Sequence, residues 1–332
     1  MPARVINAAS DGLMILSEEA QIRLGRITTD LPTTDLPVPE MTDLDAVAGW
    51  RAEQHLAWGE DVLAGEALHQ EILAGGVRTL WAGPAFDCAD PTQTAVVYLH
   101  GGGFCLGSPG TAAPITARLA RTNDAGQGLT IVSVDYRLAP EHPFPAALDD
   151  AERVVATLLD GRRLILAGDS AGANLAFGLW QRLGSGRVAG IIGLSPLLDV
   201  RPLFDRRRAS PVGGSGLVAA YVGRADPEDP LLSPSAMTEP QLAALPPVLL
   251  QTTPGDPLHP AAVVFAQRIE AVGGVVEHQV WEGLWHAWQY HRELPEAQTA
   301  VDLAAEFART QLAAAGVIDT RQRPATRSLA SR

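Results

Sequence analysis

Short apolar runs alternate with stretches of helical hydrophobic spacing from about residue 67 to residue 315. The stretches predict helices over about 111–121, 145–159, 171–183, 259–272 and 295–313. The runs between them predict buried strands at Ala95–Leu99, Leu129–Val134, Leu164–Ala167, Ile191–Leu194, Val248–Thr252 and Val275–Val280. Strands that are apolar along nearly their whole length and are separated by helices are typical of a mostly parallel sheet covered on both faces. We therefore expect an α/β fold.

Three parts of the chain depart from this alternation. Residues 1–66 have helical patterns interrupted by prolines, with one helix expected near 17–24 and another from Thr42 to about Gly65. Residues 200–235 interrupt the alternation after the fourth apolar run. Residues 316–332 are rich in Arg, Thr and Ser, and this composition predicts a flexible tail.

Composition argues against several classes of protein. The chain has 332 residues and a formal net charge of −13, which disfavours nucleic acid or an anionic membrane as a partner. No signal peptide and no apolar stretch of membrane-spanning length is visible, so we expect a cytoplasmic protein. Two cysteines make no disulfide framework, and Cys105 is expected to be a small buried residue whose influence on a site is open. The histidines and cysteines lack zinc-site spacing, so we expect no metal and no cofactor.

The segment Gly168–Gly172 has the pattern G-x-S-x-G and lies between a predicted strand and a predicted helix. In that context the pattern is typical of a nucleophile elbow, in which a sharp turn exposes Ser170 at the carboxyl end of a sheet. The same five residues also fit an ordinary turn whose serine caps the helix. The motif alone leaves both interpretations open.

A nucleophilic serine needs a base and an acid that orients the base. His286 is the candidate base because it follows the last predicted strand, although a histidine between two tryptophans is often only a packed core residue. Asp256 is the candidate acid and follows the Val248–Thr252 strand, where it could instead form a turn or cap the next helix. Glu277 and Glu282 are rivals because they are near His286 in the sequence.

The run His100–Phe104 contains three glycines directly after the Ala95–Leu99 strand. Glycines there allow backbone N–H groups to point toward a reacting oxygen, and we assign Gly102, Gly103 and Ala171 as the oxyanion donors. A glycine-rich loop after a strand could also bind a phosphate. This run lacks both the G-K-[ST] ending and a G-x-G-x-x-G that opens a helix, which disfavours phosphate.

Taken together, these segments resemble the hormone-sensitive-lipase-like α/β-hydrolases, the bacterial family IV esterases. The matching pieces are His100–Phe104, Asp135–Ala146, Gly168–Gly172, Asp256–Leu258 and Gly283 with His286. The resemblance covers about residues 67–315. It implies a Ser170–His286–Asp256 triad, no cofactor and a helical cap. The expected organisation is cap residues 1–66 and 200–235, core residues 67–199 and 236–315, and tail residues 316–332. We also expect an Arg137–Glu141 pair to fix a loop behind the site.

The resemblance further implies a carboxylesterase that acts on short to medium acyl esters of a small-molecule alcohol. Lactone or formamide hydrolysis, and a non-catalytic receptor on the same fold, are the alternatives. The segment Leu217–Tyr221 has mostly small residues where relatives often carry bulky aromatics, so we expect a wider or shallower acyl pocket. A homodimer through the Val275–Val280 strand is also expected. The pocket is expected to be lined by Phe104, Leu217, Tyr221, Leu258 and Trp288.

Overall fold

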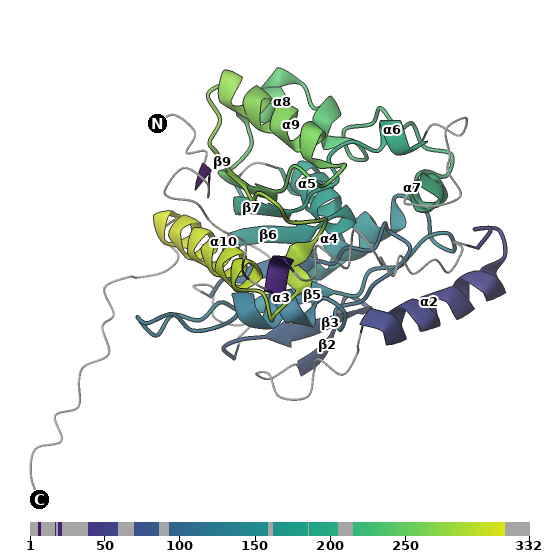
Figure 1. The fold of residues 1–332 in the computed structure, drawn as a ribbon, viewed down its shortest axis with the longest axis horizontal. Helices are drawn as coiled ribbons and strands as arrows, with labels where there is room; N and C mark the ends of the chain where they lie inside the picture. Colours follow the sequence, from purple (N-terminus) through teal and green to yellow (C-terminus); the bar gives the residue numbers. More distant parts are fainter. Residues whose placement is uncertain are drawn as a thin grey trace, which may run out of the picture.

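The computed structural model describes residues 6–7, 17, 19–21, 39–58, 70–85, 93–158, 162–184, 186–204 and 215–315. Within these residues it has one nine-stranded sheet in the order β1-β9-β8-β7-β6-β4-β5-β3-β2 (Figure 1). All neighbouring strands are parallel except the pairs β2–β3 and β3–β5, so the expected mostly parallel α/β fold is confirmed. The strands are Ile6–Asn7 (β1), Gln70–Ala74 (β2), Val77–Ala82 (β3), Ala95–Leu99 (β4), Ile131–Val134 (β5), Leu164–Asp169 (β6), Val188–Leu194 (β7), Val248–Thr252 (β8) and Val276–Val280 (β9).

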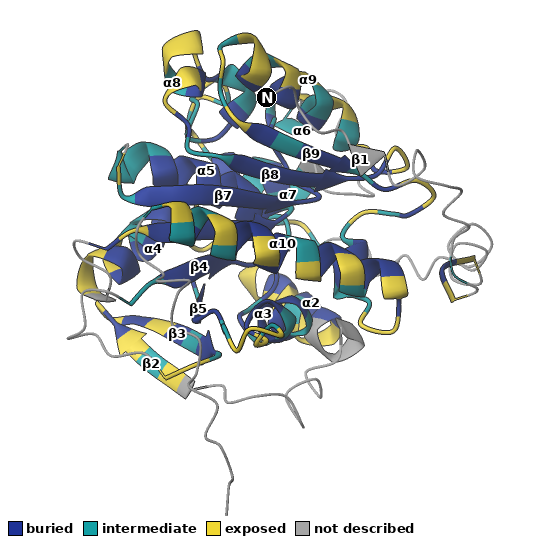
Figure 2. Cartoon of the chain, turned by 90° about the vertical axis from the view of Figure 1, so that its left-hand side faces the viewer, coloured by how far each residue is buried: buried dark blue, intermediate teal, exposed yellow. Residues whose placement is uncertain are grey.

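Helices cover both faces of the sheet, and the strands between them are buried (Figure 2). Because successive side chains of a strand point to opposite faces, Val97 and Leu99 of β4 join one hydrophobic cluster while Val96 and Tyr98 join another. The first cluster is completed by α4 (Ala146–Leu158), α5 (Ala171–Leu183) and α9 (His259–Ala271), and the second by α3 (Ala113–Leu119) and α10 (Pro295–Ala314).

The hairpin β2–β3 is one part of the sheet that the apolar runs did not resolve into strands, and the two-residue β1 is another. Its register pairs Ala74 with Val77, so Gly75 and Gly76 form a two-residue turn. The burial of β3 alternates at Val77, Arg78 and Thr79, because this strand lies near the edge of the sheet. Alternating strands of this kind give a weaker hydrophobic signal than the continuous runs of the central strands.

Parts of both expected cap segments are described. Residues 39–58 include α2 (Leu44–Trp58), and residues 19–21 are helical. The second segment contains α6 (Arg201–Phe204), α7 (Ser215–Val222) and the 3-10 helix η2 (Pro234–Ala236), and α8 (Glu239–Ala243) follows. Residues 205–214 and the predicted tail 316–332 lie outside the described residues. Of the helices that are described, none is long and apolar enough to cross a membrane.

An arginine of α2 ties the N-terminal segment to the core. Arg51 forms an ion pair with Glu141 at 2.6 Å, and its guanidinium also donates to the carbonyl oxygens of Cys105 and Ala139. The expected Arg137–Glu141 pair is therefore wrong. Arg137 instead pairs with the buried carboxylate of Asp150 at 2.8 Å, and its pKa is raised mainly by that hydrogen bond.

The outer edge of β9 is partly occupied within the chain. Ile6 and Asn7 of β1 pair in parallel with Gln279 and Val280. Our expectation of an edge available for a second copy is therefore wrong at these two positions. A homodimer stays a prediction, and it would need other residues of this strand or another surface.

Candidate active site

Three segments that are far apart in the sequence meet at the carboxyl end of the sheet. Ser170 follows β6, Asp256 lies after β8, and His286 lies after β9. Nε2 of His286 lies 3.0 Å from Oγ of Ser170, and Nδ1 lies 2.7 Å from Oδ2 of Asp256. Because an ionised carboxylate only accepts hydrogen bonds, the Nδ1–H tautomer donates to Asp256 and leaves Nε2 free to accept from Ser170. This arrangement can remove the proton of the serine hydroxyl.

Ser170 has the strained backbone of a sharp strand-to-helix turn, with φ 49° and ψ −116°. Its side chain makes no capping hydrogen bond to α5, so the alternative of a helix-capping serine is wrong. The turn depends on the close approach of two backbones. A Cβ at Gly172 would lie 1.9 Å from the carbonyl oxygen of Leu99. Any residue larger than glycine would therefore force one of the two backbones to move. A strained residue that projects from such a turn is a common feature of functional sites.

The carboxylate that contacts His286 is that of Asp256 rather than that of either rival glutamate. The side chain of Asp256 is only 1% exposed, and its second oxygen accepts the amide of Leu258 at 2.9 Å. The aspartate therefore also forms the local turn, and both functions are compatible. Glu277 accepts a hydrogen bond from Gln279 on its own strand, and Glu282 is exposed. The His286 side chain is 39% exposed, so its ring is accessible from solvent.

The loop that carries His286 is anchored by a serine that sequence reasoning missed. Oγ of Ser195 accepts the amide of Ala287 at 3.1 Å, and the amide of Ser195 donates to the carbonyl oxygen of Gln251. Ser195 is fully buried, and both Ser195 and Ala287 have positive φ, at 45° and 57°. Its only sequence signal is its position directly after β7, which is too common to identify an anchor.

The glycine-rich loop lies beside the nucleophile elbow in an unusual backbone conformation. Gly102 and Gly103 have φ of 114° and 59°. Among the residues that the structure describes, no acceptor takes a hydrogen bond from the amides of Gly102, Gly103 or Ala171. Ala171 is also the first residue of α5, where the amide has no partner within the helix. Free amides next to a nucleophile can stabilise a developing negative charge.

Tyr136 holds the start of this loop. Its hydroxyl donates to the carbonyl oxygen of His100 at 2.6 Å, and the two rings are stacked with centroids 4.1 Å apart. Burial raises the pKa of Tyr136 well above its ordinary value, so the phenol keeps its proton and remains a donor.

The five expected pocket residues do not share one environment. Phe104 and Tyr221 are fully buried and stack face to face with ring centroids 3.8 Å apart. Trp288 is fully buried in a different cluster, where it packs near Trp281. Leu217 and Leu258 are only partly buried.

Cys105 packs inside the core rather than facing the reacting groups. It is fully buried, and its Sγ lies 3.4 Å from the carbonyl oxygen of Leu217. Burial raises the pKa of its thiol to about 12. The expectation of a small buried residue is confirmed.

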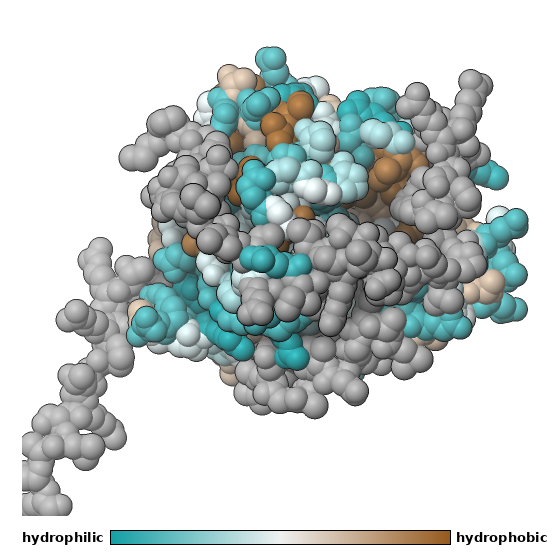
Figure 3. Space-filling view, viewed as in Figure 1, coloured by the Kyte–Doolittle hydropathy of each residue, from teal (hydrophilic) through white to brown (hydrophobic). Residues whose placement is uncertain are grey.

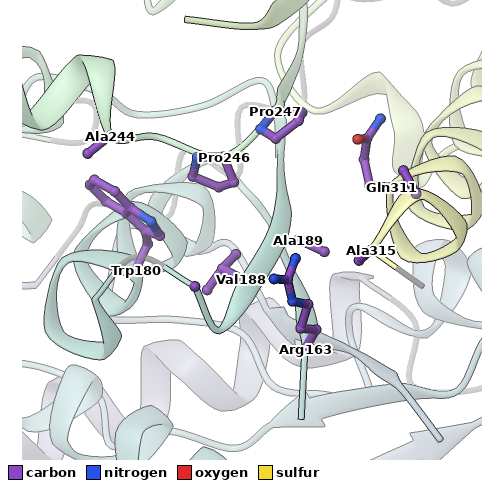
Figure 4. Close-up of a pocket in the computed structure, with 11 residues that line it drawn as sticks. Arg163, Trp180, Val188, Ala189, Ala244, Pro246, Pro247, Gln311 and Ala315 are labelled. Carbon is purple, nitrogen blue, oxygen red and sulfur yellow. The ribbon is translucent and has the colours of Figure 1, made fainter. Parts of the chain in front are cut away.

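A pocket of about 320 Å³ lies away from these groups (Figure 4). Arg163 and Val188 in its lining stand at the amino ends of β6 and β7, whereas Ser170 follows the carboxyl end of β6. Trp180, Pro246 and Pro247 complete its apolar side. Its position separates it from the Ser170–His286–Asp256 arrangement.

Comparisons with known proteins place the chain among relatives that share its fold. A family model described as "alpha/beta hydrolase fold" matches residues 96–290. An acetyl-hydrolase of Streptomyces hygroscopicus is 34% identical over 255 residues, which cover 72% of this chain and 82% of the relative. A crystal structure of a hormone-sensitive lipase from a metagenome library has a TM-score of 0.72 at 28% identity, over 88% of this chain and 98% of that one. The esterase EstE5, in a crystal soaked with p-nitrophenyl butyrate, has a TM-score of 0.71 at 26% identity, over 89% and 99% of the two chains.

Proposed function

The chain belongs to the α/β-hydrolase fold family as a carboxylesterase of the hormone-sensitive-lipase-like group, and from this premise we propose that Ser170 is its nucleophile. In this proposal His286 is the general base, Asp256 orients it, and the amides of Gly102, Gly103 and Ala171 form the oxyanion hole. The observation that carries the proposal is the unbroken series of contacts from the Ser170 hydroxyl through the His286 ring to the buried Asp256 carboxylate.

The reaction follows from the positions of these groups. Oγ of Ser170 attacks the ester carbonyl carbon while Nε2 of His286 takes the hydroxyl proton. Asp256 stabilises the imidazolium that forms, and the three amides stabilise the oxyanion of the tetrahedral intermediate. His286 then gives the proton to the leaving alkoxide, and an acyl-enzyme remains on Ser170. Water activated by His286 hydrolyses the acyl-enzyme and restores the hydroxyl.

We propose short to medium acyl chains, and two observations support this choice. Leu217 lies next to the proposed oxyanion loop, because a Cβ at Gly103 would meet its Cδ1 at 2.8 Å. Phe104, the residue after Gly103, is fully buried and stacks on the equally buried ring of Tyr221, so these two rings offer no open space to a long acyl chain. Apolar surface gathers over α7, at the upper right of Figure 3, where the acyl group could lie. The names of the acetyl-hydrolase and the butyrate-soaked EstE5 agree with substrates of this size.

The test is a panel of p-nitrophenyl esters, lactones and N-substituted formamides in which acyl and alcohol parts vary independently. We expect the highest kcat/KM for short to medium acyl esters. Ser170→Ala should abolish turnover without loss of the fold, and Ser235→Ala is the matched control at a serine of η2 outside the proposed triad. Turnover near wild type in Ser170→Ala would refute the assignment. A preference for lactones or formamides would refute the substrate class, and no turnover of any compound would favour a receptor.

A further inference from the structure

Asp169 is a buried carboxylate directly beside the proposed nucleophile, and the reaction described above does not use it. Its residue is only 2% exposed, whereas buried charges need strong partners to be tolerated. It is the last residue of β6 and directly precedes Ser170. The contacts of its two oxygens show how its burial is tolerated.

Three donors from three different segments converge on this carboxylate. Oδ1 accepts the hydroxyl of Tyr98 at 2.8 Å and the amide of Gly101 at 3.0 Å. Oδ2 accepts the hydroxyl of Tyr290 at 3.0 Å. Tyr98 belongs to β4, Gly101 to the glycine-rich loop, and Tyr290 to η3 (Trp288–Tyr290), which closely follows His286.

The protonation of these groups supports hydrogen bonds in this direction. The pKa of Asp169 is raised above its ordinary value, mainly by burial, and the hydrogen bonds from Tyr98, Tyr290 and the Gly101 amide offset only part of this rise. Burial and the nearby carboxylate raise the pKa of both phenols well above their ordinary values, so both remain donors.

The carboxylate also touches the backbone of the loop that it holds. A Cβ at Gly101 would lie 2.1 Å from Oδ2 of Asp169, so only glycine allows this approach. Gly102 and Gly103, the proposed oxyanion donors, are the next two residues. A shift of the carboxylate would therefore move the amides that face the reacting oxygen.

We propose that Asp169 is a positioning residue that fixes the oxyanion loop, and through Tyr290 the His286 segment, against the nucleophile elbow. The proposal rests on the proposed function, because it concerns the same reaction. A misplacement of about 1 Å in an active site can cost about 10²-fold in rate. A residue that only supported the fold would lower stability and leave the turnover of each intact site unchanged.

Two kinds of substitution separate positioning from charge. Asp169→Asn keeps an oxygen for Tyr98 and Gly101, and its amide can donate to Tyr290, so it removes the charge and retains the contacts. Asp169→Ala removes every contact. Asp169→Ser is a second truncation in case the alanine variant does not fold, because its hydroxyl is too short to reach the Gly101 amide.

The first readouts are kcat and KM for p-nitrophenyl butyrate, with active sites counted by fluorophosphonate labelling. The second is the Ki of butylboronic acid, which mimics the tetrahedral intermediate. We expect the truncations to lower kcat per labelled site by about 10²-fold and to raise the boronate Ki by a similar factor, with KM little changed. Asp169→Asn should keep most of the wild-type kcat and Ki.

Two results would overturn the proposal. If a truncated variant has the wild-type kcat per labelled site, Asp169 is only structural. If Asp169→Asn is as impaired as the truncations, the charge acts rather than the position. Failure of the proposed function is distinguishable, because in that case Ser170→Ala itself would retain turnover.

Discussion

Gly172→Ala adds one methyl group at the tightest contact of the nucleophile elbow. The new Cβ would lie 1.9 Å from the carbonyl oxygen of Leu99, whereas an ordinary C···O contact is about 3.3 Å, so one backbone has to move by about 1.4 Å. The contact is between backbones, and no flexible side chain can relieve it. Overpacking of this kind costs about 1–3 kcal/mol of stability. Because Ser170 is two residues away, a displacement near 1 Å should also lower kcat by about 10²-fold.

The assay compares Tm and kcat of Gly172→Ala with those of Gly49→Ala. Gly49 lies within α2, and a Cβ there would have no atom within 4 Å. The control should therefore gain about 0.5–1 kcal/mol, as alanine usually does in a helix, and keep its activity. The reasoning is refuted if Gly172→Ala has the Tm and kcat of the wild type.

Three further predictions concern the acid, a buried histidine and the buried thiol. Asp256→Asn should lower kcat by about 10⁴-fold with the fold intact, because the histidine loses the acceptor that selects its tautomer; an equal loss in the control Glu282→Gln would contradict this. Burial lowers the pKa of His278 to about 4 from its ordinary 6.5, so the unfolded chain binds a proton at a higher pH than the folded chain does. The free energy of unfolding should therefore fall by up to about 3 kcal/mol as the pH falls from 6.5 to 4. Urea unfolding at several pH values should show that the free energy of unfolding depends less steeply on pH in His278→Gln than in the wild type. An unchanged dependence would exclude His278 as its source. Iodoacetamide at pH 8 should leave Cys105 unmodified in the native protein and alkylate it in urea, as measured by peptide mass spectrometry; rapid native alkylation would disprove its burial.

Local hydrophobic patterns in the sequence were sufficient to predict the positions of the central strands. The runs Ala95–Leu99 and Val248–Thr252 have the same bounds in the structure, because each starts with three or more apolar residues and is buried along its whole length. The β2–β3 hairpin was not resolved into strands, since an edge strand alternates and gives a weaker signal. The two-residue β1 is too short for any periodicity to reveal.

Contacts between distant residues could not be read from the sequence. Arg137 and Glu141 are close in sequence and opposite in charge, yet their partners are Asp150 and Arg51. The motifs placed Ser170, Asp256 and His286 after three strands of a parallel sheet, whose carboxyl ends lie at one edge. They gave no sign of the anchors Ser195 and Asp169, because each acts only through tertiary hydrogen bonds.

The proposed reaction depends on Ser170 as a nucleophile that His286 activates. The most direct measurement is the site and rate of fluorophosphonate labelling, determined by peptide mass spectrometry. We expect one label per chain, on Ser170, with loss of activity in proportion to labelling and a labelling rate greatly reduced in His286→Ala. A label on another residue that parallels the loss of activity, or full ester turnover with Ser170 modified, would contradict it.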